Sequence, residues 1–192
     1  MLVALLAVLS ASAAAGMRIA LPLLAIGLLQ SDRLWNDIPL LAAIPPRVVL
    51  GVLTSWSLFE LFGSKQLLGQ RTLQILQLTL SPLVGALMAI ATLKIIHVEF
   101  EPIWLIAVVG GLLALVLALV QVGWFFRQRG LPLWVALGED VLCIFLVFFA
   151  FNAPQQGGLI AMLLLWLAAR SSNAWYRWYR QRDQEPTRPI SR

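Results

Sequence analysis

This chain has 192 residues, of which 60% are hydrophobic and only 12% are charged, whereas about 25% of residues are charged in soluble domains. At about 20 residues per membrane-spanning helix, this length accommodates about five to seven spans and leaves no room for a soluble domain. The net charge of +5 comes largely from arginines beside hydrophobic segments and in the last residues, which favours membrane orientation over nucleic-acid binding.

The first element, residues 1–29, contains an arginine between two apolar runs. The small residues at 10–13 would suit a signal peptide, but no basic residue precedes the run and a second apolar run follows Arg18, so we expect a retained span. Gly16 and Pro22 lead either to one kinked span or to two short helices that meet around Arg18. These alternatives place the N-terminus on different sides of the membrane.

Arg18 lies away from the ends of this element in both alternatives. An arginine at the centre of a membrane helix costs about 2.5 to 3.5 kcal/mol on insertion scales, so it should face protein, water or a counter-charge. The acids available inside later spans are Glu60, Glu139 and Asp140. Arg18 is then either a structural ion pair or part of an anion or proton path.

The remaining spans are expected at residues 47–63, 72–93, 103–126, 132–152 and 157–176, and they form with the first one a single domain over residues 1–180. In the second span, Thr54, Ser57 and Glu60 recur at intervals of three, so this polar stripe should face other helices. Glu60 either pairs with Arg18 or reaches the membrane interface. Residues 181–192 have the composition of a flexible basic tail.

One face of the third span is polar, because its members fall at i, i+3, i+7 and i+11. They are Gln74, Gln77, Ser81 and Gly85. The stripe is either interhelical hydrogen bonding or pore lining. Pro82 should kink this helix and free the carbonyl of Leu78.

The fourth span is the most apolar, and Gly110, Ala114 and Ala118 give it a ridge of small residues that suits a scaffold or an oligomer contact. The fifth carries Glu139 and Asp140, which point about 100° apart and therefore cannot share one partner face. At least one of these two acids should pair with Arg18, Arg127 or Arg129, and an unpaired member could carry a proton.

Most of the 14 Lys and Arg residues fall on the side of the C-terminus, and only Arg33, Arg47 and Lys94 fall on the other side. This distribution predicts a multi-pass protein of a bacterial plasma membrane or thylakoid membrane with a cytoplasmic C-terminus. A division into three spans plus three suggests an inverted repeat, as in many transporters, in which Glu60 would correspond to Glu139.

Several of these residues form a recurring pattern. It consists of a small-residue helix, Gly16-x-Arg18, Pro22, Glu60, Pro82-x-x-Gly85 and Glu139-Asp140. The pattern resembles the bacterial membrane proteins grouped as domain of unknown function 4126, and in particular their cyanobacterial members, over nearly the whole chain up to the tail. Where that pattern has Asp-Lys after the first glutamate, this chain has Ser64-Lys65. The resemblance implies the fold and the choice of residues, but no activity.

Two non-enzymatic functions follow from these observations. The first is a small transporter or channel whose site is the Arg18, Glu60, Glu139 and Asp140 cluster, and the second is a structural or assembly protein of the membrane. Since Cys143 and His97 are the only cysteine and histidine, we expect no disulfide, metal or cofactor. An enzyme is disfavoured because the common hydrolase, zinc-protease and phosphate-loop motifs are missing. The expected partners are the lipid bilayer and either copies of this chain or other membrane proteins.

Overall fold

The computed structural model describes residues 1–29, 45–63, 67–128 and 133–182, and these residues form helices joined by short connections. The helices are α1 (Leu2–Met17), α2 (Ala20–Leu29), α5 (Pro46–Gly63), α6 (Leu67–Ile95), α7 (Ile103–Gln128), α8 (Leu133–Asn152) and α9 (Pro154–Arg182). The expected all-α fold is confirmed for the described part of the chain.

Two of the described helical segments, Thr72–Ile95 and Ile103–Phe125, are long and apolar enough to cross a membrane. Six membrane-spanning helices and an inverted repeat stay predictions. The helix bounds differ from the expected spans mainly in two places: α6 begins at Leu67 instead of 72, and α9 continues to Arg182 instead of ending at 176. Residues 183–192 of the expected tail lie outside the described residues.

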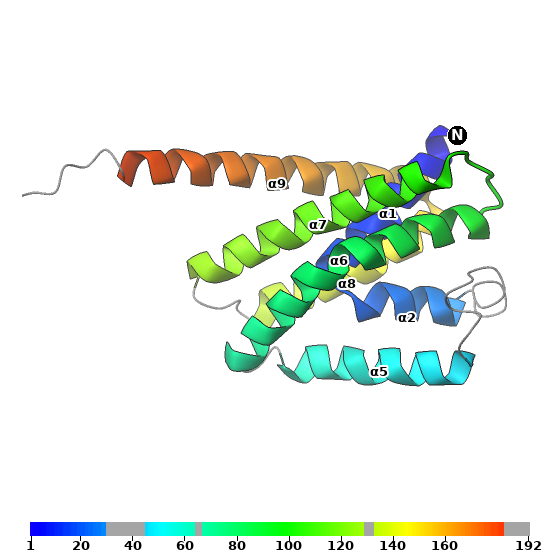
Figure 1. Cartoon of the computed structure of the whole chain (residues 1–192), viewed down its shortest axis with the longest axis horizontal. Coiled ribbons are helices and arrows are strands. Elements are labelled where there is room, and N and C mark those ends of the chain that lie inside the picture. The colour runs from blue at the N-terminus through cyan, green and yellow to red at the C-terminus, as the bar shows by residue number, and fades with distance from the viewer. Residues whose placement is uncertain (30–44, 64–66, 129–132, 183–192) are drawn as a thin grey trace, which may run out of the picture.

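Helix α1 lies at the centre of the bundle and contacts α6, α7, α8 and α9 (Figure 1). All residues from Ser10 to Met17 are buried. Since most of them are alanine, serine or glycine, neighbouring helices approach the α1 backbone closely from several sides. Small residues therefore pack against neighbouring helices on all faces of this part of α1.

The contact between α6 and α7 depends on glycines. A Cβ atom added at Gly110 would lie 2.6 Å from the Ala89 Cβ, 2.6 Å from the Ser12 Oγ and 2.8 Å from the Gly85 carbonyl oxygen. Ala114 and Ala118, the other members of the small-residue ridge, are completely buried. The ridge is therefore a contact within the chain, against α1 and α6, and is not available to a second copy.

The N-terminal region consists of two helices, as one of the two alternatives predicted. Arg18 has extended backbone angles (φ −142°, ψ 147°) and separates α1 from α2. Pro22 is the third residue of α2, in the first turn, where a missing N–H breaks no intrahelical hydrogen bond. Figure 1 shows α2 running back toward the end of the bundle that holds the N-terminus. The break at Arg18 therefore lies inside the bundle.

Candidate functional site

An ion pair occupies the break between α1 and α2. Arg18 Nε lies 2.6 Å from Asp140 Oδ1, and the two side chains are only 10% and 16% exposed. Asp140 lies in α8, which runs antiparallel to α1, as the contacts of Ser10 with Leu146 and of Ala14 with Cys143 show. The counter-charge that the sequence required for Arg18 is therefore Asp140.

Glu60 is the second acid beside Arg18. It is 6% exposed and therefore lies inside the helix bundle. Its Oε1 accepts a hydrogen bond from Trp56 Nε1 at 2.9 Å, one helical turn earlier in α5. Its Oε2 is buried and has no hydrogen-bond partner. Arg18 and Asp140 both act on Glu60 electrostatically, but among the described residues the direct ion pair of Arg18 is with Asp140.

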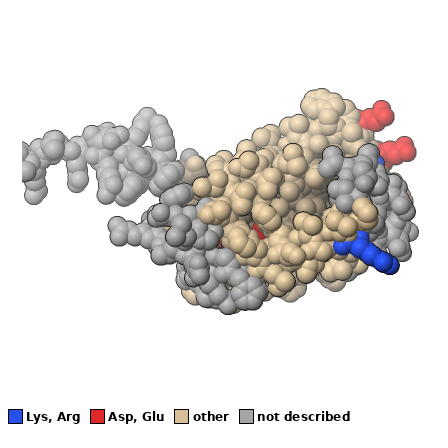
Figure 2. All heavy atoms as spheres, turned by 60° about the horizontal axis from the view of Figure 1, so that its bottom comes forward, with Lys and Arg blue, Asp and Glu red and all other residues tan. Residues whose placement is uncertain are grey.

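Arg18, Glu60 and Asp140 line a common cavity of about 230 Å³. Hydroxyl groups and leucine side chains complete its wall: Thr54, Ser57, Leu21, Leu24 and Leu58. The Ser57 Oγ is buried without a hydrogen-bond partner, like one oxygen of Glu60. Figure 2 shows acidic atoms at the bottom of a recess in an otherwise uncharged part of the surface. The cavity therefore combines apolar walls with polar atoms that the described residues do not satisfy.

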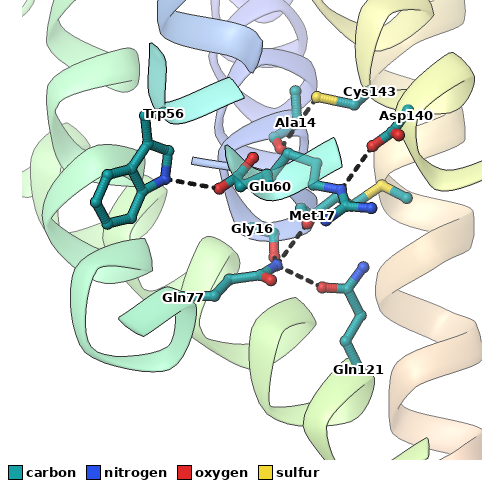
Figure 3. A network of polar contacts seen from close by, with 10 residues as sticks. Ala14, Gly16, Met17, Trp56, Glu60, Gln77, Gln121, Asp140 and Cys143 are labelled. Atoms are coloured by element: carbon teal, nitrogen blue, oxygen red, sulfur yellow. Dashed lines mark hydrogen bonds and ion pairs between the residues drawn. The ribbon is translucent and has the colours of Figure 1, made fainter. Parts of the chain in front are cut away.

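A glutamine side chain donates hydrogen bonds to the last carbonyl groups of α1, next to the break. The last carbonyl groups of a helix have no donor within the helix, and Gln77 of α6 donates from Nε2 to the carbonyls of Gly16, at 3.2 Å, and Met17. The same amide donates to Gln121 Oε1 of α7 at 2.7 Å (Figure 3). Gln77 thus connects α6 and α7 to the broken end of α1.

Glu139 contacts Gln121 and does not line the cavity. It is half-buried and has the side chain of Gln121 as a hydrogen-bond partner. This arrangement follows from the angle of about 100° between successive helical side chains. Asp140 meets Arg18 directly while Glu139, one residue earlier, meets α7.

The other expected site residues have packing roles or lie apart from the cavity. Gln74 and Ser81 are buried in α6, but the Gln74 Oε1 and Ser81 Oγ have no hydrogen-bond partner. Pro82 lies inside α6, which continues through it. Gly16 packs on α7, where an added Cβ would lie 2.8 Å from the Ala114 carbonyl oxygen. Among the described residues of the polar face of α6, Gln77 is the one whose hydrogen bonds, to the Gly16 and Met17 carbonyls, connect it to the break.

Sequence reasoning missed two members of the site. Gln121 lies in the fourth span, which was expected to be a scaffold or an oligomer contact, and its Oε1 accepts a hydrogen bond from Gln77 beside the break. A single amide in an apolar span is itself a signal of an interhelical contact. Trp56 precedes Glu60 by four residues, a spacing at which helical side chains meet.

Within the described ranges, no group of three or more histidine, cysteine, aspartate or glutamate side chains is placed to hold a metal ion. The arrangement of one arginine, two cavity-lining carboxylates and unsatisfied oxygens is instead suited to binding small polar species or protons. The candidate site is therefore a buried group of charged side chains at the junction between α1 and α2.

This combination of helices and buried charges defines a class of compact all-α proteins with membrane-length apolar helices. Residues 5–174 match the model of the family described as Domain of unknown function (DUF4126), and the chain belongs to that family. The family resemblance expected from the sequence is thus confirmed, and the cyanobacterial relationship stays a prediction. Comparisons with curated proteins and with solved structures gave no match.

Proposed function

We propose that this protein is a small transporter or channel of a bacterial membrane, with its site in the cavity beside Arg18. The observation that carries the proposal is a partly unsatisfied polar cavity at a helix break, lined by Arg18, Glu60 and Asp140. Ionisable residues inside membrane segments are costly and mark ion or substrate paths by default. Many transporters also place their sites where helices are interrupted near the middle of the membrane.

A membrane location is supported by the two long apolar helices and by the distribution of charge. On the face shown in Figure 2, the protruding charged side chains of the described residues lie at one end, and the acidic atoms in the recess are the charge visible in the middle. The N-terminus lies at the same end as the connection between α6 and α7, and α9 extends toward the opposite end (Figure 1). With the excess of arginines near the C-terminus, we propose a multi-pass protein of the plasma or thylakoid membrane with a cytoplasmic C-terminus.

A structural or assembly protein is the second candidate. It is favoured by the close packing of α1 against four other helices and by the glycines that this packing requires. In such a protein the ion pair of Arg18 and Asp140 would only fix the position of α8 on α1. A structural role does not account for the polar cavity next to this ion pair.

Flux through liposomes distinguishes the two candidates. Purified protein is reconstituted, and the flux of protons and of small cations and anions is measured for the natural chain and for Arg18→Ala and Glu60→Gln. Glu99→Gln, in the exposed connection between α6 and α7, is the matched control. We expect flux in the natural chain and in the control, and a loss of at least tenfold in the two site variants.

Two results would contradict the proposal. Absence of flux for every tested solute, with protein that elutes as a single folded species, supports the structural candidate. Unchanged flux in both site variants removes the cavity from the mechanism.

A further inference from the structure

We propose that Glu60 is the proton-binding group of the cavity, and that its protonation controls whether Arg18 is shared between two acids. This inference rests on the proposed function and specifies the ion that the site handles. In one state Glu60 is neutral and Arg18 pairs with Asp140 alone. In the other state Glu60 is charged and competes with Asp140 for the guanidinium group.

The charges around the cavity require such a proton. Among the described residues, the groups that face Glu60 are Arg18 and the backbone N–H of Ile19 from the junction of α1 and α2, Asp140 from α8, and Trp56 from its own helix. The lining residues from α2 are Leu21 and Leu24. Among the described lining residues, one positive charge therefore faces two carboxylates, so one negative charge is left over when both are ionised. In an apolar environment a proton removes this excess at the lowest cost.

Geometry selects Glu60 over Asp140 as the proton carrier. Asp140 Oδ1 is in direct contact with Arg18 at 2.6 Å. Glu60 has its Oε1 held by Trp56 while its Oε2, in a side chain only 6% exposed, has no partner. Protonation of Oε2 makes the Glu60 side chain neutral. Its burial without an ionic partner then no longer has the free-energy cost of burying a charge.

Glu139 is excluded by its position. Its carboxylate has Gln121 as a hydrogen-bond partner, and it does not line the cavity. Of the three acids near Arg18, Glu60 therefore combines access to the cavity with a buried oxygen that has neither a hydrogen bond nor a direct ion pair among the described residues.

The ligand is a proton and not a metal ion because the positively charged guanidinium group of Arg18 lines the same cavity and repels a metal cation. Within the described residues, no group of three or more histidine, cysteine, aspartate or glutamate side chains is placed to hold a metal ion. A proton needs only one carboxylate oxygen. On release, the O–H bond of Glu60 breaks, the proton passes to water in the cavity, and the electron pair stays on the carboxylate that then attracts Arg18.

A carbodiimide tests the protonation of Glu60 without any measurement of transport. Dicyclohexylcarbodiimide is apolar and converts protonated carboxyl groups in apolar sites to stable N-acylureas, which peptide mass spectrometry locates. At mildly acidic pH we expect labelling of Glu60 and at least tenfold less at Glu99 and Glu101, which are exposed. Glu60→Gln removes the label, and Glu99→Gln leaves Glu60 labelled.

Two further variants predict opposite changes at a fixed pH. Asp140→Asn frees Arg18 to pair with Glu60, which favours the charged form, so labelling decreases by about threefold or more. Trp56→Phe removes the donor that stabilises the charged carboxylate at 2.9 Å, so labelling increases. Elution of each variant as a single species in size-exclusion chromatography verifies that it is folded.

The outcomes separate this inference from the proposed function. Absence of label at Glu60 in folded protein, or label at Glu139 or Asp140 in its place, overturns the assignment even if liposomes show flux. Label at Glu60 with the expected response to Asp140→Asn supports the proton site even if flux is absent, in which case transport is the part that fails. Equal labelling in the Asp140→Asn variant and the natural chain contradicts the competition for Arg18.

Discussion

Replacing Arg18 by methionine should destabilise this protein more than replacing Asp140 by asparagine. At the observed separation of 2.6 Å, two unit charges attract each other by roughly 6 kcal/mol at an effective dielectric constant of about 20. Removing one member of a buried ion pair costs about 3 to 5 kcal/mol, because the other charge is left uncompensated. Arg18→Met leaves three acids without their cation, and we expect a loss at the upper end of this range.

Asp140→Asn lowers the stability less because Arg18 still has other carboxylates nearby. Glu60 and Glu139 both interact electrostatically with Arg18, so the cation is not left unpaired. We expect a loss of about 1 to 3 kcal/mol, as for a lost charged hydrogen bond. In the Arg18→Met background the same substitution should cost nothing, since it then removes an acid that lacks a partner.

The free energies come from reversible unfolding of the two single variants and the double variant in mixed micelles of a mild detergent and dodecyl sulfate. Glu99→Gln, on the exposed connection between α6 and α7, should stay within about 0.5 kcal/mol of the natural chain. Losses that add within about 0.5 kcal/mol in the double variant would show that Arg18 and Asp140 act independently. That result, or a larger loss for Asp140→Asn than for Arg18→Met, would refute this reasoning.

Three other substitutions test the packing around α1 by the same unfolding measurement. Gly110→Ala should cost about 1 to 3 kcal/mol by overpacking, since its Cβ would lie 2.6 Å from the Ala89 Cβ. The control Gly123→Ala, with open space around Gly123, should be neutral or stabilising. Equal effects of the two substitutions on stability would contradict the close contact at Gly110. Gln77→Leu leaves two carbonyls at the end of α1 without their hydrogen-bond donor. We therefore expect a loss of stability of about 1 to 3 kcal/mol. A loss no larger than that of a surface variant would show that Gln77 does not hold the end of α1. Ser10→Ala removes a hydrogen bond of 2.7 Å to the Leu146 carbonyl and should cost only about 0.6 kcal/mol, the average between membrane helices; a loss above about 2 kcal/mol would mean that this bond does more than join α1 to α8.

The sequence allowed much of the site to be named before its geometry was known. An arginine inside an apolar segment requires a counter-charge wherever the chain folds, and only three acids lay inside later spans. Gly16, Pro22 and Arg18 also marked the break between α1 and α2, although a single kinked helix was an equal alternative. Glutamines at helical spacing on one face of α6 predicted an interhelical contact, which Gln77 makes.

Other features could not be predicted because they depend on how distant helices meet. Gln121 joined the site only through α7, and the central position of α1 required four helices to pack on its small residues. Hydropathy is a local property and gives nearly the same signal for a central helix as for one that faces lipid. The ridge at Gly110, Ala114 and Ala118 was visible in the sequence, but its partner was not.

Composition and periodicity by themselves determined the all-helical class and the need for buried charges to be paired, because both follow from residue types along one segment. The tertiary structure decided which acid meets Arg18. Glu139 and Asp140 are adjacent in the sequence and point about 100° apart on α8, so only the rotation of α8 about its axis brings Asp140 to Arg18 and the cavity and turns Glu139 toward Gln121. That rotation is set by close contacts between α1 and α8, which no single segment encodes.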